Sequence, residues 1–197
     1  MQCTICGANA LFVCGRSGRP VCAEHARIEV VSRLSFGSSD SLSVREATSE
    51  DYSRIKQLAE YFKGKTKVSS LDKEYDLLSL PAYVADSNGN IAGVLSYAIE
   101  PEVLVIVMLD VLPGYQGLGA GSMLVERLIE KASSEKKKEV LVSTPNDDLP
   151  TIYFYQKNGF QIYEVKPNQI AKDNEVQVGF AGIPRRDEIR LRRQLKI

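Results

Sequence analysis

The 197-residue sequence has no excess charge of either sign and no long apolar run. It contains 25 Lys plus Arg and 25 Asp plus Glu, so it lacks the overall positive charge that marks many nucleic-acid-binding proteins. No apolar run is long enough to cross a membrane, and the first residues lack the apolar core of an export signal. We therefore expect a globular cytoplasmic protein that is neither membrane-bound nor specialised for nucleic acid.

Cysteine is missing after residue 22, and the single histidine follows three residues later. Cys3 and Cys6 are separated by two residues, as are Cys22 and His25. Two such pairs supply the four ligands of a tetrahedral Zn²⁺ site. We therefore predict a structural zinc site formed by Cys3, Cys6, Cys22 and His25, with Cys14 as an alternative ligand or a buried thiol. The competing interpretation is a reduced or disulfide-bonded cysteine tail, which is disfavoured because disulfides are rare in the cytosol.

The spacing of this cluster resembles that of B-box zinc fingers over the first 25 residues. In that family the first and third ligand pairs share one ion, and the second pair, here Cys14 and Ser17, helps to hold another. The histidines that would complete the second site are missing, so the resemblance implies a single Zn²⁺. Three roles stay open for such a module: stabilising the chain, forming a homodimer, or binding a protein substrate or partner.

A Ser/Gly-rich stretch, SFGSSDSLS, follows the cysteine cluster and has the composition of a flexible linker. We predict a zinc module at residues 1–29, a linker at 30–42 and one main domain at 43–197. Hydrophobic periodicity in the main domain predicts alternating strands and helices. The expected strands are 43–47, a hairpin at 82–100 turning at Asn88-Gly89, 101–111, 139–144, 160–165 and 187–195. The expected helices are 48–62 (capped by Thr48 or Ser49), 70–78, the segment from Ser122, and 148–157 (capped by Asp148).

The segment PGYQGLGAG, residues 113–121, places four glycines in nine residues directly after an apolar strand. The dinucleotide fingerprint G-x-G-x-x-G fails because Ser122 occupies the third glycine position, and a P-loop fails because no lysine follows Gly119. The remaining pattern is Gln116-x-x-Gly119-x-Gly121, which opens an amphipathic helix. Its consecutive amides, at the positive end of a helix dipole, suit a pyrophosphate held without metal.

At this point the sequence resembles the GNAT superfamily of N-acetyltransferases. Residues 109–132, LDVLPGYQGLGAGSMLVERLIEKA, are similar to the acetyl-CoA-binding motif of that family, and residues 152–160, IYFYQKNGF, are similar to its second motif. The succession of elements agrees over residues 43–195. The resemblance implies an α+β (mixed α/β) fold with a GNAT-type twisted mixed sheet flanked by helices, and acetyl-CoA as the cosubstrate.

The resemblance also implies roles for particular residues. In the family two central strands splay apart around the pantetheine arm, which here would bind the backbone of Leu109 and Val111. The Val111 amide would stabilise the thioester oxyanion, and Tyr155 would protonate the departing thiolate. The residues expected to bind the pyrophosphate are Gln116, Gly117, Leu118, Gly119, Ala120, Gly121 and Ser122.

A base must also remove a proton from the acceptor ammonium. The candidates are Glu102, Glu100 and Asp110, and we take Glu102. Two positions depart from the family pattern: Asp148 stands where Asn is frequent, and Thr151 where Ala is frequent. A core-packing role for Tyr155 also stays open.

The sequence thus predicts an N-acetyltransferase that transfers an acetyl group from acetyl-CoA to a primary amine of a protein, peptide or small molecule by direct attack. The alternative is a zinc-bearing acyl-CoA adaptor or sensor without activity, and a third hypothesis is a nucleic-acid regulator that uses the finger. The acceptor is expected to bind at residues 58–80 and 167–186, neither of which carries a diagnostic pattern.

Overall fold

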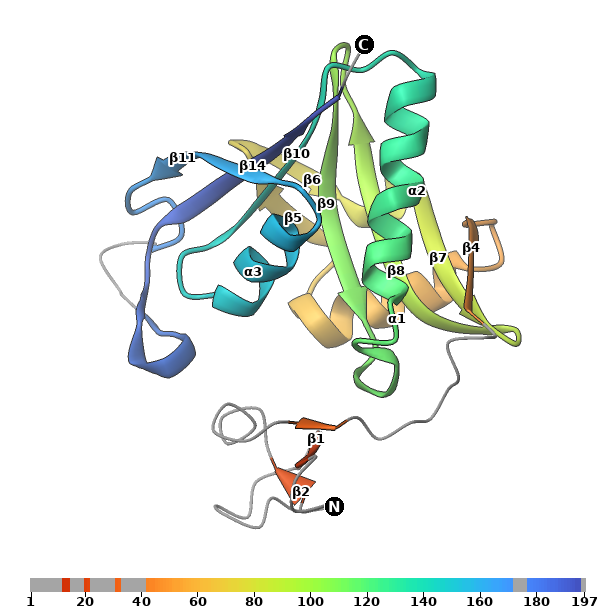
Figure 1. Cartoon of the computed structure of the whole chain (residues 1–197), viewed down its shortest axis with the longest axis horizontal. Coiled ribbons are helices and arrows are strands. Elements are labelled where there is room, and N and C mark those ends of the chain that lie inside the picture. The colour runs from red at the N-terminus through yellow and green to blue at the C-terminus, as the bar shows by residue number, and fades with distance from the viewer. Residues whose placement is uncertain (1–11, 15–19, 22–30, 33–41, 172–176, 196–197) are drawn as a thin grey trace.

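The computed structural model describes residues 12–14, 20–21, 31–32, 42–171 and 177–195 (Figure 1). Its centre is a seven-stranded sheet in the order β11-β14-β10-β9-β8-β7-β4. Every neighbouring pair is antiparallel except β9 and β10, which run parallel. The strands are β4 (Leu42–Glu46), β7 (Ala82–Ser87), β8 (Asn90–Ile99), β9 (Val103–Val111), β10 (Glu139–Pro145), β11 (Gln161–Lys166) and β14 (Glu188–Gln194).

Three helices cover the two faces of this sheet, as Figure 1 shows. They are α1 (Tyr52–Lys63), α2 (Ala120–Ser134) and α3 (Leu149–Lys157). Successive residues of a strand point to opposite faces, so Val94 of β8 joins the core under α1 and Leu95 joins the core under α2. The predicted α+β fold, with a mixed sheet flanked by helices, is confirmed.

Two short hairpins stand outside the main sheet: β5 (Lys67–Ser70) with β6 (Lys73–Asp76), and β12 (Gln177–Val178) with β13 (Pro184–Arg185). The first corrects a prediction, because residues 70–78 were expected to be helical. Leu71 and Asp72 instead form a turn with φ of 51° and 64°, and the Leu71 amide donates to Glu188 Oε1 of β14 at 3.1 Å. This long-range contact supports a turn that local sequence preference does not favour.

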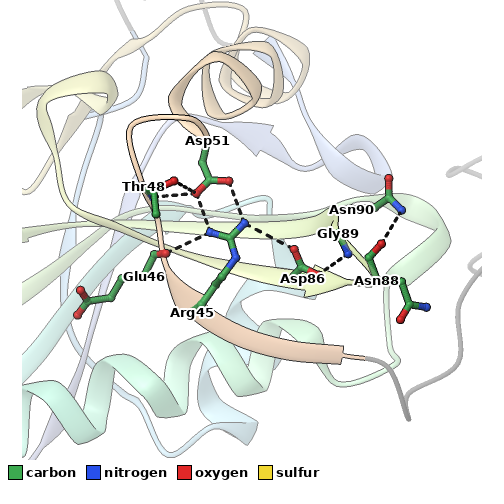
Figure 2. A network of polar contacts seen from close by, with 8 residues as sticks. All are labelled: Arg45, Glu46, Thr48, Asp51, Asp86, Asn88, Gly89 and Asn90. Carbon is green, nitrogen blue, oxygen red and sulfur yellow. Dashed lines mark hydrogen bonds and ion pairs between the residues drawn. The ribbon is translucent and has the colours of Figure 1, made fainter.

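The start of α1 also differs from the prediction. Asp51, rather than Thr48 or Ser49, is the N-cap residue, and its carboxylate binds the Arg45 guanidinium at 2.7 and 2.9 Å (Figure 2). The Thr48 amide donates to the same carboxylate at 2.7 Å, and Arg45 also lies 3.6 Å from Asp86. The hydrogen bonds from Arg45 hold the pKa of Asp51 well below its usual range. This network ties β4, β7 and the start of α1 together.

The other local predictions are mostly confirmed. Asn88 and Gly89 turn the β7–β8 hairpin with φ of 53° and 81°, and the Asp148 side chain caps α3 by accepting from the Thr151 amide at 3.2 Å. In β14, Arg190 alternates with the apolar residues Ile189 and Leu191, a pattern that indicates a side chain facing solvent, but Arg190 is only 6% exposed.

The N-terminal segment contains a three-stranded sheet of β2 (Pro20–Val21), β1 (Phe12–Cys14) and β3 (Val31–Ser32). β3 lies within the stretch predicted to be a linker and pairs with β1. The proposed zinc ligands Cys3, Cys6, Cys22 and His25 lie outside the described residues. Within the described ranges, no three His, Cys, Asp or Glu side chains cluster as a metal site requires. None of the helices described here is long and apolar enough to span a membrane.

Candidate active site

The strands β9 and β10 separate along their length, and Figure 1 shows them diverging. Their pairing runs from Val103 opposite Glu139 to Ile106 opposite Val142, and then stops although both strands continue. On the other side of β9, Ile106 and Met108 pair with consecutive residues of β8, which leaves Val107 as a bulge. A bulge bends its strand, and this one stands where the two strands part. The edge of β9 from Val107 to Val111 is thus open to an extended ligand.

The glycine-rich turn follows β9 and is braced by its own residues. A single 3₁₀ turn spans Pro113–Tyr115, and the Gln116 side chain donates to the Val111 carbonyl oxygen at 3.0 Å. Gly117 and Gly119 have φ of 69° and 98°, values that residues with a Cβ seldom adopt. The Gln116 side chain therefore holds the turn against the end of β9, directly beside the open edge.

Free amides are gathered at the N-terminus of α2. The first bond of the helix runs from the Met123 amide to the Gly119 carbonyl oxygen at 3.0 Å. The amides of Ala120, Gly121 and Ser122 therefore have no acceptor within the helix, nor elsewhere in the described part of the chain. A Cβ at Gly121 would lie 3.2 Å from the Phe154 ring, so glycine lets α2 approach α3 without a shift of that ring. These amides and the dipole of α2 suit the diphosphate of CoA.

Tyr155 lies on α3 and is only 3% exposed. Its ring makes edge contacts with Phe154 and Phe160, at centroid distances of 5.2 and 5.3 Å. Burial, reinforced by the carboxylates of Asp110 and Asp148, raises the pKa of its hydroxyl well above the usual value. That hydroxyl has no hydrogen-bond partner among the described residues. The residue is thus both a core aromatic and the carrier of an uncommitted, firmly protonated hydroxyl.

Of the three carboxylates considered as the base, the structure brings one to the opening. Asp110 adjoins Val111, its side chain is 13% exposed, and each of its oxygens lies 3.2 Å from Nζ of Lys63. Burial raises the pKa of Asp110, and the positive charge of Lys63 opposes that shift. Asp110 also lies near enough to Tyr155 to influence the pKa of its hydroxyl.

Glu102 and Glu100 are at the wrong end of β9. The Glu102 side chain is 63% exposed and forms an ion pair with Lys138 at 2.5 Å. About nine strand residues, or roughly 30 Å, separate it from Val111. The prediction of Glu102 as the base is therefore not supported by its position. The sequence already contained this signal, because Glu102 stands at the start of the strand and the glycine-rich turn follows its end.

A cavity of about 320 Å³ lies beside the part of β10 that no longer pairs with β9. The Ser70 hydroxyl, at the wall of the cavity, lies 2.9 Å from the Ser143 hydroxyl on β10. Ser143 is the first residue of β10 beyond the stretch that pairs with β9. The cavity is lined by Ser69, Ser70, Asp72, Lys73, Glu74, Gln169, Ile170 and Glu188. All but Glu188 come from the two segments expected to bind the acceptor.

The open edge of β9, next to the free amides at the N-terminus of α2, is the arrangement expected of a CoA-dependent acyltransferase. Comparisons with known proteins agree: a profile of the acetyltransferase (GNAT) family matches residues 43–160. The chain belongs to this family and is an acetyltransferase.

Individual relatives support the assignment. The Bacillus subtilis protein YdhI is 32% identical over 109 residues, which cover 53% of this chain and 67% of YdhI. The structure of an IAA acetyltransferase from Bacillus cereus shares 25% identity with a TM-score of 0.62, covering 79% of this chain and 100% of that one. A GNAT family acetyltransferase from Elizabethkingia anophelis, solved with acetyl-CoA bound, shares 23% identity and the same fold, with a TM-score of 0.61 and coverage of 79% and 99%.

Proposed function

We propose that the protein transfers the acetyl group of acetyl-CoA to a primary amine by direct attack, with both substrates bound together. The observation that carries this proposal is the separation of β9 from β10 beside the free amides of α2. The pantetheine arm pairs with the backbone of Leu109 and Val111 along the open edge. The pyrophosphate binds the amides of residues 117 and 119–122, because the Leu118 amide already donates to the Tyr115 carbonyl oxygen at 3.3 Å, while Gln116 supports that turn from behind.

The acceptor enters from the side of the cavity near Ser143. Its nitrogen attacks the thioester carbon, the C–N bond forms, and the Val111 amide donates to the oxyanion. The C–S bond then breaks, the thiolate takes the proton of Tyr155, and the second proton of the attacking nitrogen restores the tyrosine through water. Asp110 accepts the ammonium proton of the acceptor, directly or through water. It replaces Glu102 in this role because it adjoins Val111 and its charge influences the pKa of Tyr155.

The proposal is tested by mixing the full-length protein with acetyl-CoA and a panel of amines, and measuring both the free thiol and the acetylated product. The panel contains spermidine, glucosamine, free lysine, phenethylamine and short peptides with free N-termini. Product and thiol formed in equal amounts support amine acetylation. Tight CoA binding by calorimetry without thiol release across the panel would instead favour the acyl-CoA sensor.

We also propose that Cys3, Cys6, Cys22 and His25 bind one structural Zn²⁺. The support is the spacing of the two ligand pairs in the sequence. Elemental analysis of the purified protein should find one equivalent of zinc, and Cys22→Ser should lose it. Metal-free wild-type protein would refute the site. Because a site with four protein ligands has no open position for substrate, residues 42–197 alone should keep the acetyl-CoA Kd of the full chain.

A further inference from the structure

Arg190 is a buried charge in a strand position that the sequence pattern assigns to solvent. It lies on β14 between β10 and β11, with its side chain 7% exposed. Its guanidinium lies 2.8 Å from Asp72, 2.8 Å from Glu188 and 3.1 Å from Glu164. A buried ion pair seldom stabilises a fold more than apolar packing would. The arrangement therefore calls for a role beyond stability.

Of these partners, Asp72 belongs to the tip of the β5–β6 hairpin, and Glu188 contacts that tip. The tip consists of Leu71 and Asp72, both with positive φ; this conformation is costly for leucine, whereas aspartate tolerates it better. Glu188 accepts from the Leu71 amide at 3.1 Å, while Arg190 and the Gln169 side chain hold Asp72, the latter at 3.1 Å. The strained tip is thus held from β14 and from the segment after β11.

The same contacts form a wall of the cavity. Asp72, Glu188 and Gln169 line it, and Ser70 at the base of the tip meets Ser143 on β10. Of the eight residues that line it, seven have a hydroxyl, amide or charged side chain, and Ile170 is the single apolar residue. Its volume of about 320 Å³ falls at the lower end of the range for small-molecule sites.

We propose that this cavity receives a small polar amine as the acceptor, and that Arg190 and Glu188 are positioning residues which hold the hairpin tip as its wall. The inference rests on the proposed acetyl transfer to an amine. Its consequence is selective: loosening the tip weakens acceptor binding, while the binding of acetyl-CoA at the turn after β9 and the chemical step are retained.

The test compares Arg190→Met, Arg190→Lys and Asp72→Asn with wild type. The matched control is Arg192→Met, on the same strand; the Arg192 side chain is 39% exposed, and its guanidinium lies 3.8 Å from Glu139. Kinetics use acetyl-CoA with spermidine and with glucosamine, and phenethylamine serves as the apolar amine. Asp72→Asn changes a side chain that is 55% exposed, so it keeps the test informative if Arg190→Met does not fold.

We expect Arg190→Met and Asp72→Asn to raise the KM for the better polar amine about tenfold, with kcat and the KM for acetyl-CoA changed less than about twofold. Arg190→Lys should recover part of the loss, and hydrogen exchange of residues 67–76 should accelerate in Arg190→Met and Asp72→Asn but not in Arg192→Met. If wild type releases no thiol with any amine, the proposed function fails. If wild type is active but Asp72→Asn leaves the acceptor KM unchanged, or phenethylamine is the better acceptor, this inference alone is overturned.

Discussion

Replacing Tyr155 by Phe removes a single oxygen atom from a side chain that is 3% exposed. The hydroxyl has no hydrogen-bond partner among the described residues, so the change breaks no bond within the described part of the protein. The ring keeps its edge contacts with Phe154 and Phe160. We therefore expect the free energy of unfolding to change by less than about 1 kcal/mol, which makes the variant a test of chemistry rather than of folding.

The expected loss of rate follows from the role of the hydroxyl. Burial and the neighbouring carboxylates of Asp110 and Asp148 raise its pKa, so the hydroxyl keeps its proton from neutral pH to beyond about 10, the usual tyrosine value. General acids contribute about 10²–10⁴-fold to rate, which corresponds to about 2.7–5.4 kcal/mol in the barrier. Tyr155→Phe should lower kcat by this factor and leave the Kd for CoA within about twofold of wild type.

The assay follows thiol release with the best amine of the panel, and calorimetry measures the affinity for CoA. The matched control is Tyr153→Phe, two residues away on the same helix, where the side chain is 65% exposed. This control should behave like wild type. A kcat for Tyr155→Phe within twofold of wild type would refute the acid role and leave Tyr155 as a core residue.

Three further changes test the other parts of the site and the fold. Gly119 and Gly89 have φ of 98° and 81°, and each has space for a methyl group. Gly119→Ala and its matched control Gly89→Ala should therefore each cost about 1–2 kcal/mol of stability. Calorimetry should show weaker CoA binding only for Gly119→Ala. Asp51→Asn should cost about 1–3 kcal/mol at neutral pH. Arg45 lowers the pKa of Asp51 in the folded state. The stabilisation by Asp51 is therefore present above its pKa in the unfolded chain, about 3.9, and is lost as the pH falls through its pKa in the folded state. Urea unfolding should show a smaller difference in free energy of unfolding between wild type and variant at pH 3 than at pH 7. Asp110→Asn should lower kcat and abolish the acid limb of the pH–rate profile, because a base works only above its pKa; an unchanged profile would exclude Asp110.

Local patterning was enough to predict most of the fold. The apolar run of β9 predicted a strand, the failure of the nucleotide fingerprints left the glycine-rich turn as a pyrophosphate site, and the resemblance to the GNAT motif implied that the ligand is acetyl-CoA. Asn88-Gly89 predicted a hairpin turn and Asp148 a helix cap, because both act through hydrogen bonds and backbone angles within a few residues. Such features depend on nearest neighbours along the chain, so they can be seen without the fold.

Three features depended on contacts between distant segments. Residues 70–78 form a hairpin rather than a helix because Glu188, more than a hundred positions away, accepts from the Leu71 amide. Arg190 is buried in spite of its alternating pattern because β14 inserts between β10 and β11, where Glu188 of the same strand meets it together with Asp72 and Glu164 from two distant segments. Asp110 rather than Glu102 reaches the opening because β9 spans about 30 Å and only its C-terminal end leaves β10. Charge pairing and strand separation are set by the packing of the whole sheet, and no local window of the chain contains that information.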